Sequence, residues 1–288
     1  MTTLDEASGE LVVRIVYDGP PLSGKTTSVR ALATSLGREV VCPAEEDGRT
    51  VYFDFLEYTA GWFEGHAIRC QVISVPGQWS RRGRRLRLID GADALVCLVD
   101  TTRDALPRSL EHLRQLPPLL EREGPPVGFL VQANKRDHAD AVPMEEVRAA
   151  LRARRVTAGV VETVASDGSG VRECFVFAVR LALDRARALM SDGRLPKGPP
   201  DHEGADDLFS WLEGDAHRPA ACPARGVAPA PLPPGSDAPV GGIWPPVEGR
   251  VALHDAGFSP AAVARTEAGW RVDAERMTAT STPEDAFA

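Results

Sequence analysis

Apolar stretches alternate with amphipathic stretches along the first two thirds of the chain. Six short runs that are apolar or rich in β-forming residues predict strands, and one of them, ALVCLVD, is typical of a strand buried on both faces. The strands are expected at residues 11–18, 50–56, 67–75, 94–100, 127–133 and 160–164. Helical periodicity predicts helices at residues 26–36, 81–89, 106–122, 144–154 and 171–190. This alternation indicates an α/β fold, with a mostly parallel six-stranded sheet and helices on both faces.

The pattern changes after residue 190. Residues 191–288 are rich in Pro, Gly and Ala and have no regular period, which is typical of a linker or an unstructured extension. Three short apolar segments interrupt this region, at residues 208–212, 243–253 and 261–272. They are either isolated apolar spots in a tail, or docking segments that fold on a partner or back on the domain. We therefore expect a folded domain at residues 1–190 and a largely disordered extension at residues 191–288.

Composition and charge exclude several classes of protein. A net charge of -8 and a pI near 5.4 argue against nucleic-acid binding, which needs a basic face. The chain contains no run of about 18 apolar residues, so no integral membrane segment is expected. The acidic start of the chain does not resemble a secretory signal. The 5 cysteines are scattered singly, as expected of reduced thiols that fill small apolar spaces. These features predict a cytoplasmic protein.

The first chemical motif is GPPLSGKT, at residues 19–26, which fits G-x-x-x-x-G-K-[ST] between a predicted strand and a predicted helix. Backbone N–H groups at the start of such a helix surround a phosphate. Lys25 would add a positive charge for the terminal phosphates, and the Thr26 hydroxyl would bind Mg²⁺. Lysine is rare in this Arg-rich chain, which argues against a chance match. The candidate phosphate-binding residues are Gly19, Leu22, Ser23, Gly24, Lys25, Thr26 and Thr27.

The second motif, NKRD, follows the strand predicted at residues 127–133. Asp137 can accept two hydrogen bonds from the N1–H and the exocyclic amine of guanine, which adenine does not offer. A carboxylate left unpaired by the wrong base costs on the order of 1–3 kcal/mol. The stem of Lys135 can lie over the base, and Asn134 can tie this loop to the phosphate loop. Together the two motifs predict a site for GTP and GDP.

With these motifs in this order, the chain resembles the MglA branch of the bacterial Ras-like GTPases, which are switches of gliding motility and cell polarity. The resemblance is carried by VYDGPPLSGKTT, TVYFDFLEYTAG, VISVPGQ and NKRDHADAVPMEEVR. It extends over roughly residues 12–190 and does not include the extension. It implies a P-loop GTPase fold with GTP or GDP and Mg²⁺ as ligands.

The resemblance also implies roles for five further residues. ETVAS, at residues 162–166, is similar to the E-T-S-A-K box, in which the N–H of Ala165 would contact guanine O6. In SVPGQ, Gly77 would offer its N–H to the γ-phosphate and Gln78 would orient the attacking water. Thr50 would bind Mg²⁺, and Arg49 would act as a built-in arginine finger, worth roughly 10³–10⁵ in rate. The alternative for Arg49 is a solvated loop arginine.

Some positions leave alternatives open. Ser74 replaces the metal-side Asp of most GTPases, and Asp54 either substitutes for that carboxylate or is an ordinary strand residue. Pro21 stands where this branch has Gly, and its ring could crowd the γ-phosphate and impair hydrolysis while binding survives. A basic run at the start of the helix predicted at residues 81–89 is either a solvated face or a surface for an acidic partner, with Trp79 as an exposed anchor. The run comprises Arg81, Arg82, Arg84, Arg85 and Arg87.

The leading interpretation is a regulatory GTPase that hydrolyses GTP slowly without an activator. The resemblance implies a GTPase-activating protein, of the dimeric Roadblock type, and an effector that reads the two switch segments. One alternative is a GTP-binding scaffold that does not hydrolyse GTP. Another is a P-loop ATPase with Asp100 as its metal-side acid, and NKRD argues against it because an ATP site has no use for a guanine-matched carboxylate.

Overall fold

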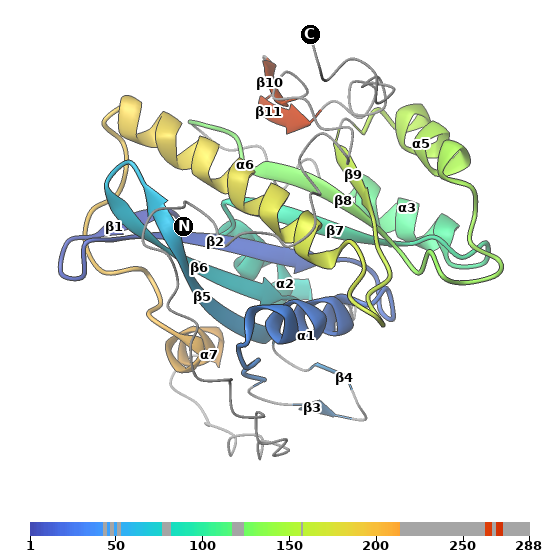
Figure 1. Cartoon of the computed structure of the whole chain (residues 1–288), viewed down its shortest axis with the longest axis horizontal. Coiled ribbons are helices and arrows are strands. Elements are labelled where there is room, and N and C mark those ends of the chain that lie inside the picture. Colours follow the sequence, from blue (N-terminus) through green and yellow to red (C-terminus); the bar gives the residue numbers. More distant parts are fainter. Residues whose placement is uncertain are drawn as a thin grey trace, which may run out of the picture.

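The computed structural model describes residues 1–42, 45–46, 49–50, 53–76, 82–116, 124–156, 158–213, 263–266 and 269–272. Its centre is a seven-stranded sheet (Figure 1). Six strands follow the order β5-β6-β2-β7-β8-β9, and β1 pairs with the first residues of β2. The strands are β1 (Thr3–Asp5), β2 (Glu10–Asp18), β5 (Asp54–Phe63), β6 (His66–Ser74), β7 (Ala94–Asp100), β8 (Gly128–Asn134) and β9 (Gly159–Glu162).

The sheet is mostly parallel, and helices cover both of its faces. Strands β6, β2, β7, β8 and β9 run parallel, and β5 lies antiparallel to β6 at the edge. One apolar cluster joins the sheet to α1 (Lys25–Leu36) and α6 (Val171–Ser191), which lie in front of the sheet in Figure 1. The other cluster holds residues of α2 (Arg82–Asp90), α3 (Leu106–Arg114), α5 (Met144–Ala153) and α7 (Ala205–Glu213). This confirms the predicted α/β fold.

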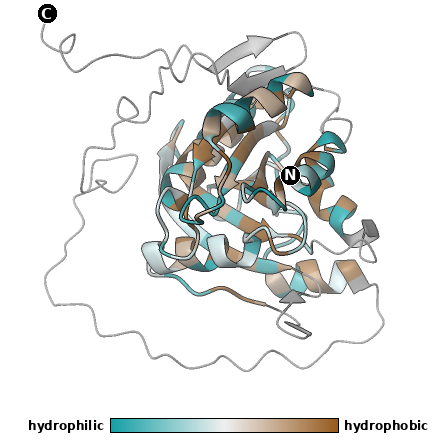
Figure 2. Cartoon of the chain, turned by 90° about the vertical axis from the view of Figure 1, so that its right-hand side faces the viewer, coloured by the Kyte–Doolittle hydropathy of each residue, from teal (hydrophilic) through white to brown (hydrophobic). Residues whose placement is uncertain are grey.

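Apolar side chains fill the space between these layers. In Figure 2 the helices carry both hydrophobic and hydrophilic positions, as expected of elements with one face on the core. Cys70, Cys97 and Cys174 are fully buried, and burial raises the pKa of the Cys70 thiol to about 12. These three thiols are the small apolar fillers that the sequence predicts. None of the helices that the structure describes combines the length and the hydropathy that a membrane span requires.

Two elements differ from their predicted bounds. Strand β5 begins at Asp54 and not at residue 50, because Thr50 belongs to a separate two-stranded hairpin of β3 (Glu45–Glu46) and β4 (Arg49–Thr50). Helix α3 ends at Arg114, well before residue 122. The prolines at positions 117 and 118 have no N–H to continue the hydrogen-bond ladder, which accounts for the early end.

Residues after α6 return to the folded domain. Residues 196–198 run beside β1, where the N–H of Leu4 donates to the carbonyl of Pro196 and the N–H of Gly198 donates to the carbonyl of Leu4. The apolar segment predicted at residues 208–212 forms part of α7, and its buried residues are Leu208, Phe209 and Leu212. This segment therefore folds back on the domain. The segment at 243–253 lies outside the described residues, and part of the third forms the hairpin of β10 (Val263–Thr266) and β11 (Gly269–Val272).

Candidate functional site

The predicted motifs meet at one edge of the sheet. GPPLSGKT follows β2, and NKRD and ETVAS begin at the ends of β8 and β9. The strand ends are in register, because Asp100 of β7 lies opposite Asn134 of β8 and Ala133 lies opposite Glu162 of β9. The carboxyl edge of a parallel sheet is where such folds bind ligands.

The loop between β2 and α1 has the backbone of a phosphate cradle. Leu22 and Gly24 adopt left-handed conformations, with φ of 66° and 99°. Left-handed residues in such a loop turn successive N–H groups toward the same side, which makes an anion-binding nest at a helix N-terminus. The Leu22 side chain is 71% exposed, so it does not obstruct the loop from inside. Thr27 lies in the first turn of α1 and is also exposed.

Lys25 points into this loop. Its ammonium donates to the carbonyl oxygens of Gly19 (2.8 Å) and Pro20 (2.9 Å), and its side chain is buried. Burial lowers the pKa of Lys25 to about 8, and the nearby carboxylate of Asp18 only partly opposes this shift. A desolvated cation held by the carbonyl groups of this loop is suited to meet phosphate oxygens.

Asn134 joins the guanine loop to the phosphate loop. Its Nδ2 donates to the carbonyl of Ser23 (2.9 Å), and its Oδ1 accepts from the Thr163 hydroxyl (3.1 Å) and from the N–H of Ala165 (3.0 Å). A Cβ on Gly24 would lie 2.2 Å from Asn134 Nδ2, so only glycine fits there. The three motifs are therefore fixed relative to one another. The Ala165 N–H, which the sequence assigns to guanine O6, is engaged by Asn134.

Asp100 belongs to the guanine side of the site and not to the metal side. Its Oδ2 lies 2.6 Å from the ammonium of Lys135, and its Oδ1 accepts from the N–H and hydroxyl of Thr102. The idea of Asp100 as the metal-side acid of an ATPase therefore has no geometric support, because the Thr26 hydroxyl bonds a different carboxylate. Asp137, the predicted base reader, is exposed at the rim.

Two polar residues that the sequence did not single out hold this loop in place. Arg136 pairs with Glu162 at the end of β9 (3.1 Å) and donates to the carbonyl of Val142 (2.7 Å). Gln132, buried in β8, donates to the hydroxyls of Ser28 in α1 and Thr163 after β9. Arg136 lies inside the NKRD motif itself. The sequence could have indicated Gln132, because it is a polar residue in the otherwise apolar run at residues 127–133.

The residues on the predicted metal side of the site come from the start of α1, the start of β5 and the end of β6. Thr26 Oγ1 donates to Asp54 Oδ2 at 2.6 Å, and Asp54 is fully buried. Asp54 lies directly opposite Ser74 in the antiparallel ladder of β5 and β6. Within the described residues, the buried hydroxyls of Ser74 and Ser23 have no hydrogen-bond partner. A carboxylate beside a threonine hydroxyl, with unsatisfied hydroxyls nearby, fits a phosphate-bound Mg²⁺.

Helix α2 is tied to the phosphate loop by a buried ionic cluster. Arg85 makes two hydrogen bonds with Asp18, the residue before Gly19, and His112 of α3 lies 3.0 Å from the same carboxylate. Burial alone would raise the pKa of Asp18, but the hydrogen bonds from His112 and Arg85 outweigh it and hold this pKa well below its usual value. The predicted solvated basic face is therefore wrong for Arg85, which shares its side of α2 with Leu88 and Ile89.

The structure describes some predicted positions only in part and others not at all. Gly77, Gln78, Trp79 and Arg81 lie outside the described residues. For Arg49 and Thr50 the structure gives the backbone in β4, and their roles stay predictions. Pro21 is half-buried in the phosphate loop.

The sequence comparisons agree with this arrangement. A search against protein-family models finds no match. The chain is 30% identical over 190 residues to the mutual gliding-motility protein MglA of Myxococcus xanthus (strain DK1622), and the match covers 64% of this chain and 96% of that protein. It spans almost the whole relative and leaves the rest of this chain without a counterpart there. The parallel sheet, the tied motif loops and this match together show that the chain belongs to the MglA-like family of Ras-like small GTPases.

Proposed function

We propose that this protein is a guanine-nucleotide switch that binds GTP and GDP with Mg²⁺ and hydrolyses GTP. The observation that carries the proposal is the hydrogen bond from Asn134 to the carbonyl of Ser23, because it fixes the base-reading loop against the phosphate loop. A nucleotide lying across this junction would place its phosphates at Lys25 and its base at Asp137. Selectivity for guanine follows from the acceptor-only carboxylate of Asp137.

Mg²⁺, when bound, would neutralise charge on the β- and γ-phosphates during phosphoryl transfer. Thr26 is the residue that would hold it on this side of the site. Because the Thr26 hydroxyl directs its proton to Asp54, a cation on this side would face the oxygen lone pairs of Oγ1 and not its proton. Asp54 thereby supplies, from the neighbouring strand, the negative charge that Ser74 lacks.

The roles of the residues in hydrolysis are proposed from the family resemblance. Gln78 would orient the attacking water, Gly77 would bind the γ-phosphate, and Arg49 would stabilise charge in the transition state. Thr50 would be a second ligand of Mg²⁺. We further propose a role in cell polarity or motility, with a Roadblock-type activator and an effector that reads the switch segments, because the relative is a gliding-motility protein.

Binding tests the first half of the proposal. Removing the Lys25 ammonium takes away charge-assisted hydrogen bonds, so Lys25→Ala should weaken GDP binding by about 10- to 100-fold. Arg108→Ala is the control, because this basic residue is exposed on α3 and lies outside the phosphate loop. Titration of fluorescent GDP in the presence of Mg²⁺ measures both. Equal affinities for the parent and Lys25→Ala would refute the phosphate site.

Single-turnover hydrolysis of GTP tests the second half. The parent should hydrolyse GTP slowly, and Gln78→Ala should be slower still. The alternative is a scaffold that binds GTP without turnover, and it is favoured by the half-buried Pro21, whose ring would crowd the γ-phosphate. If the parent binds GTP without hydrolysing it and Pro21→Gly restores turnover, the scaffold is correct and Pro21 is its cause.

A further inference from the structure

Helix α7 lies against the helix that follows the predicted catalytic loop. The guanidinium of Arg87 in α2 lies over the ring of Trp211 in α7, 5.9 Å from its centroid. On the inner side, Leu208, Phe209 and Leu212 are buried in the same apolar cluster as Leu88 and Ile89 of α2. The burial of these three side chains anchors α7 to the domain on the side of the sheet that α2 covers.

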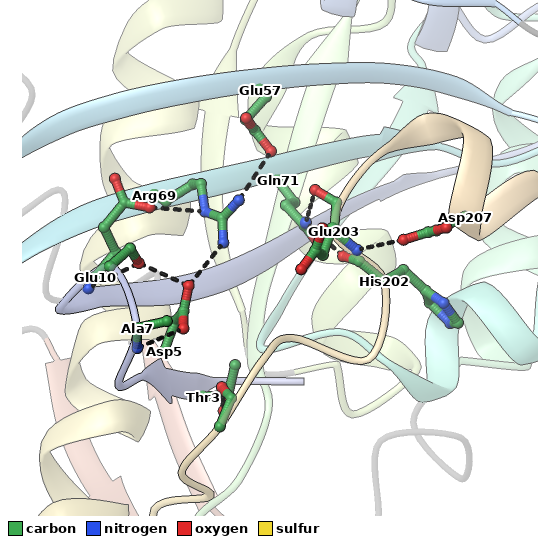
Figure 3. Close-up of polar contacts among 12 residues, drawn as sticks. Thr3, Asp5, Ala7, Glu10, Glu57, Arg69, Gln71, His202, Glu203 and Asp207 are labelled. Carbon is green, nitrogen blue, oxygen red and sulfur yellow. Dashed lines mark hydrogen bonds and ion pairs between the residues drawn. The ribbon is translucent and has the colours of Figure 1, made fainter.

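The segment that leads into α7 is also attached to β6. Gln71 Nε2 donates to the carbonyl of His202 (2.9 Å), while its Oε1 accepts from the Arg14 guanidinium (2.8 Å). Figure 3 shows Gln71 reaching from its strand to the backbone at His202 and Glu203. Gln71 and Arg14 are buried. The hydrogen bond therefore connects the sheet interior to the C-terminal segment, defined here as residues 192–213.

The C-terminal segment has its own internal order at this point. The N–H of Glu203 donates to the Asp207 side chain (3.3 Å), and Asp206 and Asp207 lie in the first turn of α7, where negative charge favours a helix. The His202 ring packs on Trp211, with 4.7 Å between their centroids. Trp211 is thus held between His202 of its own segment and Arg87 of α2.

These attachments flank the predicted catalytic loop in the sequence. Strand β6 ends at Ser74, the positions of Gly77 and Gln78 follow, and α2 begins at Arg82. The C-terminal segment contacts β6 before this loop and α2 after it. Two residues before Arg87, Arg85 pairs with Asp18 at the start of the phosphate loop. A continuous series of contacts therefore leads from Trp211 through α2 to the phosphate loop.

We propose that the C-terminal segment is a tethered regulator that packs on α2 and slows the release of bound nucleotide. This inference rests on the proposed function, because it requires a nucleotide at the phosphate loop. The physical reason is that α7 stabilises the position of α2 in which Arg85 holds Asp18 and the loop after it. Coupling between two sites is reciprocal, so nucleotide binding in turn strengthens the packing of α7.

The test uses the full chain with two variants of α7. Trp211→Ala removes the contact with Arg87, and Leu208→Ala removes a buried anchor. Ser210→Ala is the control, because Ser210 is exposed on the same helix. Release of fluorescent GDP should be faster by about 5- to 150-fold in both α7 variants and unchanged in the control. Hydrogen exchange should rise in α7 and α2 of these variants, and GDP should lower it in the parent.

The outcomes separate this inference from the function it rests on. A parent chain that binds no guanine nucleotide overturns both. A chain that binds GDP, but releases it within about twofold of the parent rate in either α7 variant, overturns only the regulatory role of the C-terminal segment. A Ser210→Ala rate as fast as those of the two variants overturns it as well.

Discussion

Arg85 and Asp18 form a buried, two-pronged ion pair, with Nε 2.8 Å from Oδ1 and Nη2 2.8 Å from Oδ2. Asp18 has no exposed surface and Arg85 is 5% exposed. The pair joins helix α2 to the last residue before the phosphate loop. Because neither charge reaches water, each depends on the other for its solvation.

Replacing Arg85 should therefore be strongly destabilising. Arg85→Met keeps much of the side-chain volume but leaves the buried Asp18 carboxylate without a guanidinium and with the hydrogen bond from His112, which costs up to about 5 kcal/mol in free energy of unfolding. The pKa of Asp18 is lowered in the folded state, so the loss should be complete at neutral pH and shrink only as the pH falls below about 4. Urea unfolding measures it. Arg108→Met, on the exposed side of α3, is the control, and an equal effect of both changes would contradict the buried pair.

Alanine substitutions at Gly24 and Gly37 distinguish a steric requirement for glycine from a requirement for its positive φ. A Cβ at Gly24 would lie 2.2 Å from Asn134 Nδ2, whereas a Cβ at Gly37 meets nothing within 4 Å. Both glycines have positive φ, at the two ends of α1, so each alanine carries a similar backbone strain of roughly 1–2 kcal/mol. Gly24→Ala should abolish GDP binding, and Gly37→Ala should lower only the melting temperature. Retained binding in Gly24→Ala would show that the two loops are not packed as described.

Asp54 should control the affinity for Mg²⁺ and not that for the base. Asp54→Asn preserves an oxygen for the Thr26 hydroxyl but removes the negative charge, so the Mg²⁺ concentration needed to retain GDP should rise about 10- to 100-fold. Glu57→Gln, on the same strand, removes an equal charge farther from Thr26. Nucleotide retention over a range of free Mg²⁺ distinguishes the two. Unchanged Mg²⁺ dependence in Asp54→Asn would exclude a role for Asp54 at the metal.

The pKa of Lys25 gives a pH dependence with a defined sign. Burial lowers this pKa from 10.5 to about 8, so between these values the unfolded chain binds more protons and the free protein gains stability as pH rises. Phosphate needs the protonated amine, so nucleotide affinity should fall above pH 8, by up to about tenfold per pH unit.

The control for this profile is Lys25→Arg, whose guanidinium stays charged throughout. Titration of the guanine base itself affects both proteins equally, so the difference between the two affinity profiles is the quantity to measure. Parallel profiles from pH 7 to 9.5 would contradict a lowered pKa of Lys25.

The sequence predicts the sheet and the two chief motifs well because both depend on local pattern. Apolar runs mark β2, β7 and β8 directly, and each motif is contiguous in the chain. Strand β1 and helix α7 were not predicted, because they are short and owe their structure to distant partners. Leu4 pairs with residues 196 to 198, and the anchors of α7 pack on an element more than a hundred residues earlier.

The roles that the sequence pattern leaves open depend on the register of the strands and on the rotation of the helices about their axes. Asp54 could be read as an ordinary strand residue until its position opposite Ser74 is known. Arg85 belongs to a run of similar arginines, and only the rotation of α2 turns this one inward to Asp18. Such choices are made by tertiary packing and leave no mark in the local sequence.

The central claim is that Asp137 selects guanine. In Asp137→Asn the carboxylate becomes an amide, which can donate to the 2-oxo group of xanthine but can no longer accept from the 2-amino group of guanine. Competition of GDP, XDP and ADP for the parent and for Asp137→Asn is the direct measurement. The parent should prefer GDP over the other two, and Asp137→Asn should lose that preference and gain affinity for XDP. A parent that binds ADP as tightly as GDP, or an Asp137→Asn protein that keeps its preference for GDP, would contradict the claim.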